Sequence, residues 1–270
     1  MSSKSIQGTG GAGRAGDKVF SGITLLAGCL ILTVLFAVAA FLLWQALPTF
    51  SAPSEDISGG SGFLAYIFPL VIGTVIAAAI ALLIATPVGL GVALFISHYA
   101  PRRLSQALGY VVDLLAAIPS VVYGAWGMTV LAPALVGPYN WLAENAGWFP
   151  LFTGPASQTG KTMLTAGIVL SVMVLPIITS LSREIFLQTP KLHEEAALAM
   201  GATRWEMIRM AVLPFARPGI ISAIMLGLGR ALGETMAVAL VLSSGGLIAS
   251  LIRPGNQTIA AEIALNFPEA

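Results

Sequence analysis

The chain has 270 residues, of which 57% are hydrophobic and only 9% are charged, and its formal net charge is +1. A soluble domain carries about 25% charged residues, so this composition excludes a water-soluble enzyme and predicts a surface that mostly faces lipid. A net charge near zero gives no electrostatic case for nucleic-acid binding, and one cysteine with two distant histidines excludes an internal disulfide and gives no metal-ligand cluster.

The N-terminal part of the chain predicts a tail and an anchor. Residues 1–18 are rich in glycine, serine and threonine, which is typical of a disordered, solvated tail. The next apolar run covers 19–47 and is stopped by Pro48. A bilayer core of about 30 Å needs roughly 20 apolar residues as helix, and a secretory signal core has only about 7–15. We therefore predict a retained transmembrane helix at 19–47 and an external loop at 48–65.

Four further uncharged runs are long enough to cross a bilayer. They predict spans at about 69–96, 108–135, 162–181 and 218–242, with Pro119 interrupting the third. After the fifth span, a polar loop leads to another helical pattern that begins at Thr258. No segment shows the alternation of apolar and polar positions that is typical of membrane β-strands. The sequence therefore predicts an all-α transmembrane fold with five full spans.

The basic residues indicate the orientation, because cytoplasmic loops carry an excess of lysine and arginine. If the five spans alternate, the N-terminus is cytoplasmic and 136–161 is an external, interfacial loop with aromatic anchors at Trp141, Trp148 and Phe149. Ten of the 13 basic residues then lie on the cytoplasmic side: Lys4, Arg14, Lys18, Arg102, Arg103, Arg183, Lys191, Arg204, Arg209 and Arg217.

The cytoplasmic segment 182–217 is the most polar part of the chain. Thr189 followed by Pro190 predicts an N-cap and a first helical residue. Gly201 predicts a left-handed turn at the end of the same short helix.

A second short helix is predicted directly after this turn. Thr203 and Glu206 match a capping box, in which each residue satisfies a backbone N–H at the start of a helix. We expect this helix to end before Pro214. Small residues on a short exposed helix suit insertion into a groove of another protein.

The same segment carries a family motif. In order it has Glu195-Ala196-Ala197, three residues, Gly201, nine residues and Ala211-Val212-Leu213-Pro214. This closely resembles the EAA motif of bacterial ABC importer permeases, with Ala211 where the family favours isoleucine. In that family the motif helix docks into a cleft of the ATP-binding subunit. The resemblance implies a role in ATPase coupling for Glu195, Ala196, Ala197, Gly201, Leu213 and Pro214.

A charged pair lies inside the predicted fifth span. Arg230 is at its midpoint, and Glu234 follows one helical turn later on the same face. Each charge at the bilayer centre costs about 2.5–3.5 kcal/mol on insertion scales, so the pair must face protein or water. Two interpretations are open: an interhelical salt bridge that fixes packing, or a pathway on which Arg230 binds an anion while Glu234 holds the guanidinium.

The residues around this pair indicate one group within the ABC importer permeases. The stretch from Gly229 to Val238 (GRALGETMAV) is similar to the signature of a permease subunit of the high-affinity phosphate ABC importer, and Ile118 to Gly124 (IPSVVYG) is similar to a stretch in both permease subunits of that importer. The resemblance covers about 66–270. It implies a type I ABC importer permease core that imports inorganic phosphate. It also implies a sixth span after the five predicted ones, and we expect that span to be absent or incomplete at the C-terminus of this chain.

The resemblance also implies partners. These are a second, PstA-like permease subunit, two ATP-binding subunits and an extracytoplasmic phosphate-binding protein, assembled in the plasma membrane of a bacterium. The chain has no G-x-x-x-x-G-K-[ST] motif. We therefore expect ATP and magnesium on the partner ATPase, with no cofactor, metal or enzyme activity on this chain.

Several residues keep two interpretations. Pro119 either marks a break in a gate-lining helix or is a packed kink whose freed carbonyl is satisfied by neighbours. Asp113 is interpreted as an interfacial charge that pairs with Arg102 or Arg103, and His98 as structural.

Two alternatives to phosphate import remain at this point. The first is a permease of the same architecture for another oxyanion such as sulfate or molybdate. The second is an ion-coupled secondary transporter, for which inverted internal repeats are expected, and no such repeat is evident in the sequence.

Overall fold

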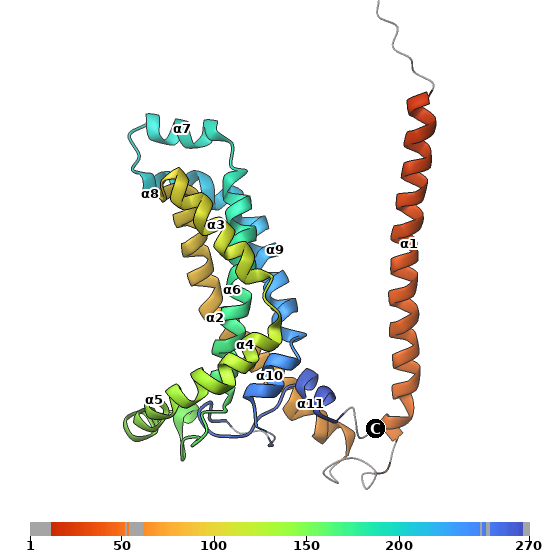
Figure 1. Cartoon of the computed structure of the whole chain (residues 1–270), viewed down its shortest axis with the longest axis vertical. Helices are drawn as coiled ribbons and strands as arrows, with labels where there is room; N and C mark the ends of the chain where they lie inside the picture. Colours follow the sequence, from red (N-terminus) through yellow and green to blue (C-terminus); the bar gives the residue numbers. More distant parts are fainter. Residues whose placement is uncertain (1–11, 52, 54–61, 244, 247–248, 267–270) are drawn as a thin grey trace, which may run out of the picture. The chain divides into compact units, whose positions relative to one another are not determined.

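In a computed structural model, the described part of the chain folds into helices joined by loops (Figure 1). The structure describes residues 12–51, 53, 62–243, 245–246 and 249–266, and these contain no strand. The chain divides into two units, Met1–Tyr66 and Ile67–Ala270. The helices are α1 (Ala12–Ala46), α2 (Phe63–Leu94), α3 (Arg102–Ala116), α4 (Ser120–Trp126), α5 (Ala132–Asn145), α6 (Met163–Leu187), α7 (Lys191–Ala199), α8 (Arg204–Met207), α9 (Leu213–Leu232), α10 (Met236–Val241) and α11 (Ile259–Asn266). Short π-helical turns cover Phe95–Tyr99, Gly127–Leu131 and Ile208–Val212, and 3-10 turns cover Leu47–Ser51 and Pro150–Phe152.

Helix α1 makes up most of the described part of the first unit. It begins at Ala12, so the predicted tail is wrong for residues 12–18, while 1–11 lie outside the described residues. A formed helix extends at low cost, because each added residue gains a backbone hydrogen bond without a new nucleation step. The predicted stop is confirmed: α1 ends at Ala46, and Pro48 lies in the following 3-10 turn.

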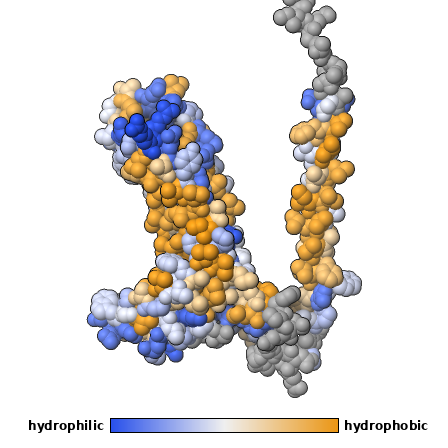
Figure 2. Space-filling view, in the orientation of Figure 1, coloured by the Kyte–Doolittle hydropathy of each residue, from blue (hydrophilic) through white to orange (hydrophobic). Residues whose placement is uncertain are grey.

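Five helical stretches of the described residues are long and apolar enough to cross a membrane, as predicted. On the face of the second unit that Figure 2 shows, apolar surface covers the middle of the helices, and polar surface gathers at the end that carries α7 and α8 and at the opposite end. The five stretches are Gly16–Phe50, Phe63–Tyr99, Ser120–Asn145, Met163–Leu187 and Arg204–Leu232.

The third stretch is shifted from its prediction at 108–135. Helix α3 ends at Ala116, Pro119 precedes α4, and the apolar stretch begins at Ser120 and continues to Asn145. The shift arises because Pro119 cannot donate a backbone hydrogen bond and forces the preceding residue out of helical geometry. About half of the predicted external loop at 136–161 is therefore helical.

The fifth stretch is also displaced. The predicted end before Pro214 is wrong, because helix continues from Arg204 to Leu232. A π-helical turn at Ile208–Val212 ends two residues before Pro214, and its shifted hydrogen bonds accommodate the residue that lacks an N–H. The predicted continuous helix at 218–242 instead breaks after Leu232, and α10 starts at Met236.

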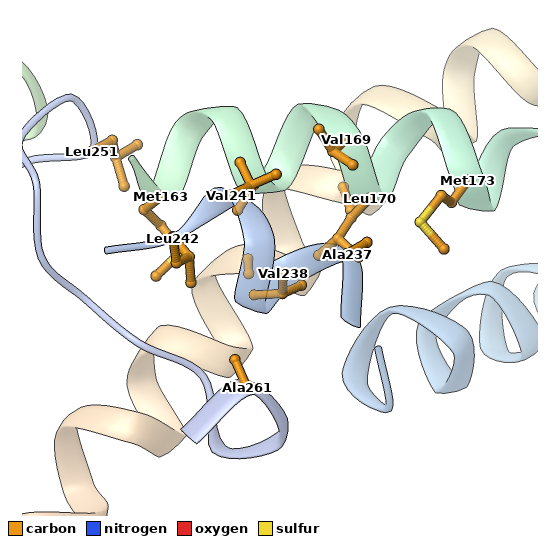
Figure 3. Close-up of a cluster of buried hydrophobic side chains, with 13 residues drawn as sticks. Met163, Val169, Leu170, Met173, Ala237, Val238, Val241, Leu242, Leu251 and Ala261 are labelled. Carbon is orange, nitrogen blue, oxygen red and sulfur yellow. The ribbon is translucent and has the colours of Figure 1, made fainter. Parts of the chain in front are cut away.

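Helix α6 is the centre of the second unit, because 61% of its apolar window is buried, compared with at most 28% for the other four stretches. Glycine allows α9 to approach it: a Cβ added at Gly227 would lie 2.8 Å from Cγ1 of Val174. A cluster of buried side chains joins α6 to α10, to the loop after it and to α11 (Figure 3). Its labelled members are Met163, Val169, Leu170, Met173, Ala237, Val238, Val241, Leu242, Leu251 and Ala261.

The polar segment after α10 is packed into the protein. Asn256, Gln257 and Thr258 are buried, and the Ile259 N–H donates to Oγ1 of Thr74 on α2 at 3.0 Å. Thr258 accepts a hydrogen bond from the Ala261 N–H, which caps α11. The helix predicted to begin near Thr258 is thus confirmed as α11.

Candidate substrate pathway and coupling segment

The Arg230–Glu234 pair is present, but not at the middle of an uninterrupted helix. Arg230 is in the last turn of α9, and Glu234 lies in the three-residue break before α10. Arg230 Nη2 is 3.7 Å from Glu234 Oε2. The two side chains differ in burial: Arg230 is 45% exposed, whereas Glu234 is only 4% exposed. The arginine side chain is therefore partly exposed at the surface of this chain, while the glutamate that pairs with it is buried.

Glu234 has a second role in the local structure. Its Oε1 accepts a hydrogen bond from the Ala237 N–H at 3.2 Å, which satisfies one of the free donors at the start of α10. One carboxylate thus fixes the start of α10 and the guanidinium of Arg230. A carboxylate is suited to this, since it accepts through both oxygens when ionised.

The start of α10 is in close contact with α4. A Cβ added at Gly124 of α4 would lie 2.6 Å from Cα of Ala237, so the two backbones meet without an intervening side chain. Ala237 is also the residue that donates to Glu234. The structure therefore connects Arg230 and Glu234 to the helix that begins after Pro119, a connection that the sequence motifs did not indicate.

Pro119 marks a complete break between α3 and α4, because it is the N-cap of α4 in an extended conformation (φ −58°, ψ 137°). The Tyr123 hydroxyl donates to the Leu115 carbonyl across the break at 2.9 Å, and the Ile118 N–H donates to the same oxygen at 3.3 Å. The interpretation that neighbours satisfy a freed carbonyl agrees with these bonds. A gating role for Pro119 stays a prediction.

The pairing expected for Asp113 is wrong. Its Oδ2 lies 3.8 Å from Nη2 of Arg183 on α6, and Arg183 also pairs with Glu184 at 3.2 Å. The guanidinium fits against α3 because Gly109 has no side chain at that point. Asp113 therefore joins α3 to α6, and no local signal in the sequence could have selected this partner.

The coupling segment, residues 182–217, has the predicted turn at Gly201, but its first short helix begins one residue later than predicted. Pro190 is the N-cap of α7 and its first helical residue is Lys191, so Thr189 does not cap the helix. Gly201 has φ +86°, and the Ala202 N–H donates to the Ala197 carbonyl in the pattern of a Schellman motif.

The predicted capping box is confirmed at α8. The Thr203 hydroxyl accepts from the Glu206 N–H, and the Glu206 carboxylate accepts from the Thr203 N–H at 2.8 Å. Tight ends on both sides of the turn hold α7 and α8 in a defined relation.

The residues of the EAA motif differ in how exposed they are to solvent. Glu195, Ala196 and Gly201 are exposed, and Leu213 and Pro214 lie further along on α9. Ala197 is buried instead, within a cluster that includes Phe186 and Ile208. It therefore anchors α7 to the rest of the chain.

The exposed face of α7 borders a groove. The groove has a volume of about 440 Å³ and is lined by Leu192, His193, Ala196, Ala197, Met200, Met210 and Ala211. Leu192 and Met200 are 74% and 80% exposed. Large apolar side chains on such a surface are typical of an interaction site.

Fold and site together define a class of protein: a multi-pass α-helical membrane permease with a charged pair at a helix break and a helical coupling segment at one end. Residues 85–269 match the family described as binding-protein-dependent transport system inner membrane component. The chain belongs to this family, whose members are membrane permeases of ABC transporters and work with other subunits.

Named relatives are more specific. The chain is 45% identical to a phosphate transport system permease protein PstC 2 of Mycobacterium tuberculosis, over 93% of this chain and 81% of that protein. It is 41% identical to a phosphate transport system permease protein PstC of Mesorhizobium japonicum, over 94% and 80% of the two chains. Among solved structures, an inward-facing MetNI methionine ABC transporter matches with a TM-score of 0.46 and 22% identity, over 62% of this chain and 68% of that chain.

Proposed function

We propose that this chain is the permease subunit of an ATP-driven importer that carries inorganic phosphate across the plasma membrane of a bacterium. The observation that carries the proposal is the half-exposed side chain of Arg230, which pairs with the buried carboxylate of Glu234 at a helix break. The names of the relatives support phosphate as the anion.

The geometry suits transient binding of an oxyanion. A guanidinium offers planar donors that match two phosphate oxygens, and its charge persists at any physiological pH. Glu234 offsets that charge, so the anion meets a partly neutralised site and is bound weakly enough to leave again. The hydrogen bond from Ala237 keeps the glutamate in place when an anion approaches Arg230.

The proposal includes an assembly. A second, PstA-like permease subunit would complete the pathway on the exposed side of Arg230, and a phosphate-binding protein would deliver the anion from outside. Two ATP-binding subunits, which would hold ATP and magnesium, would dock at the coupling segment on the cytoplasmic side. The N-terminus of this chain would then be cytoplasmic, because ten of its 13 basic residues lie on that side of the five spans.

The pathway is tested with Arg230→Gln in the complete transporter. We expect uptake of radiolabelled phosphate to be lost while the ATPase subunits still co-purify, because glutamine has no charge but leaves the coupling segment intact. Arg230→Lys is expected to retain partial uptake, since lysine keeps the charge without the planar donors. The control is Arg103→Gln, an exposed arginine on α3. Normal uptake by Arg230→Gln at normal expression would refute the pathway.

Competition with unlabelled anions tests the substrate. We expect phosphate and arsenate to compete for uptake of labelled phosphate, and sulfate and molybdate to have no effect. Stronger competition by sulfate or molybdate would refute phosphate in favour of another oxyanion.

The docking role of α7 is tested separately with Ala196→Arg. This residue is exposed and lines the groove, so a long cation should reduce co-purification of the ATPase subunits without unfolding the permease. Ala107→Arg, at an exposed alanine of α3, is the matched control. ATPase subunits that remain bound to Ala196→Arg as to the wild type would contradict docking on this face.

A further inference from the structure

Helix α7 is attached to the membrane helices at few points. Of its nine residues only Ala197 is buried. Among the described residues, one contact between a carboxylate and a basic side chain connects α7 to another helical element: Glu194 Oε1 lies 3.5 Å from Nε2 of His98. Glu194 directly precedes the motif glutamate Glu195 and is not part of the motif. No sequence motif associates it with a histidine 96 positions earlier.

His98 lies one residue before the end of the long second stretch, in the π-helical turn Phe95–Tyr99 that follows α2. Its side chain is 9% exposed, whereas that of Glu194 is 24% exposed. The imidazole also packs edge-on against Phe186 of α6, with ring centroids 6.5 Å apart. His98 is therefore held in place by its neighbours, and Glu194 contacts it from α7.

A neighbouring hydroxyl orients the ring of His98. The single proton of the Ser97 hydroxyl can be donated either to the Leu94 carbonyl, at 3.3 Å, or to Nδ1 of His98, at 2.7 Å. When the hydroxyl donates to Nδ1, the ring carries its proton on Nε2, the nitrogen that faces Glu194. The Nε2 proton then lies on the side of the Glu194 carboxylate, and at 3.5 Å the contact is electrostatic and longer than a charge-assisted hydrogen bond.

We propose that His98 is a positioning residue for energy coupling, which acts through Glu194 and ties α7 to the end of the second transmembrane stretch. A movement imposed on α7 would then reach that stretch through the Glu194 carboxylate and the imidazole, in addition to the packing of Ala197. The π-helical turn is a suitable recipient, because π-helical turns interrupt the regular hydrogen bonding of a helix and are frequent at functional sites. This inference rests on the proposed docking of an ATPase at α7.

The experiment uses the complete transporter in proteoliposomes and measures phosphate transported per ATP hydrolysed. For His98→Ala we expect at least a fivefold fall in this ratio, about the lower limit of typical coupling between sites, with ATPase subunits co-purifying at the wild-type level. Glu194→Ala should give a similar fall, and the double variant should be no worse than either single one. His98→Gln should recover most of the ratio, because its amide can still donate to Glu194. Tyr99→Phe, in the same turn, is the control.

Three results would overturn the inference: an unchanged ratio in His98→Ala, an additive double variant, or a His98→Gln protein that is as uncoupled as His98→Ala at equal thermal stability. The last would assign the effect to packing against Phe186. If His98→Ala does not accumulate, Glu194→Ala still tests the inference, because its side chain is partly exposed and its loss should not unfold the protein. A normal ratio of phosphate transported to ATP hydrolysed in Glu194→Ala refutes the inference. Failure of the proposed docking gives a different result, since Ala196→Arg would then keep its ATPase subunits.

Discussion

The contact between Gly124 and Ala237 gives a prediction whose size follows from the structure. In Gly124→Ala the new Cβ would lie 2.6 Å from Cα of Ala237. Ordinary carbon contacts are about 3.5–4.0 Å, so α4 and α10 must separate by about 1 Å. The opposing atom belongs to the backbone and cannot rotate away, and overpacking of this kind costs about 1–3 kcal/mol.

The matched control is Gly91→Ala on α2, where nothing lies within 4 Å of the added Cβ. Both substitutions gain the same helix propensity, about 1 kcal/mol, which cancels in the comparison. The assay is equilibrium unfolding in detergent micelles, and we expect Gly124→Ala to be about 1–3 kcal/mol less stable than Gly91→Ala. Phosphate uptake should fall as well, because the displaced Ala237 N–H is the donor to Glu234. Equal stability of the two variants would refute the close approach of α4 and α10.

Two further predictions concern the ends of the second unit. Gly201→Ala places a Cβ in open space but keeps φ at +86°, so we expect a cost of about 1–2 kcal/mol from the left-handed backbone alone and faster hydrogen exchange of the α7 amides; exchange at the wild-type rate would contradict this. Tyr139→Phe removes a buried hydroxyl that lies 2.7 Å from Thr165 Oγ1, and thermal unfolding should show a loss of about 1 kcal/mol. The loss should stay near that value because Thr165 keeps the Gly160 carbonyl as an acceptor, and an undiminished melting temperature would exclude a stabilising role for this bond.

The sequence by itself determined the features that depend on short stretches of chain. The number of spans follows from the length of apolar runs, since a bilayer of given thickness requires a minimum helix length. The capping box at Thr203 and the left-handed turn at Gly201 follow from residues within three or four positions of each other. Arg230 and Glu234 were found for the same reason, because one helical turn separates them and their cost in lipid demands a function or a partner.

The boundaries of helices were less predictable. The sequence predicts that a helix ends before Pro214, but the helix continues through this residue after a π-helical turn. The helix instead breaks at 233–235, between α9 and α10. A proline only removes one hydrogen bond and crowds one turn. Whether the helix continues depends on the packing of that turn against its neighbours, as with Val212 in the buried cluster around Phe186.

Only the tertiary structure decided the contacts between distant parts of the chain. Asp113 pairs with Arg183 rather than with its sequence neighbours, His98 meets Glu194, and Gly124 brings α4 onto Ala237. A charged residue in an apolar sequence predicts a neutralising partner, and a glycine predicts a close approach of two backbones. Neither identifies the residue with which the contact is made. The partner is selected by how the helices pack around α6, which sums many weak contacts over the whole unit.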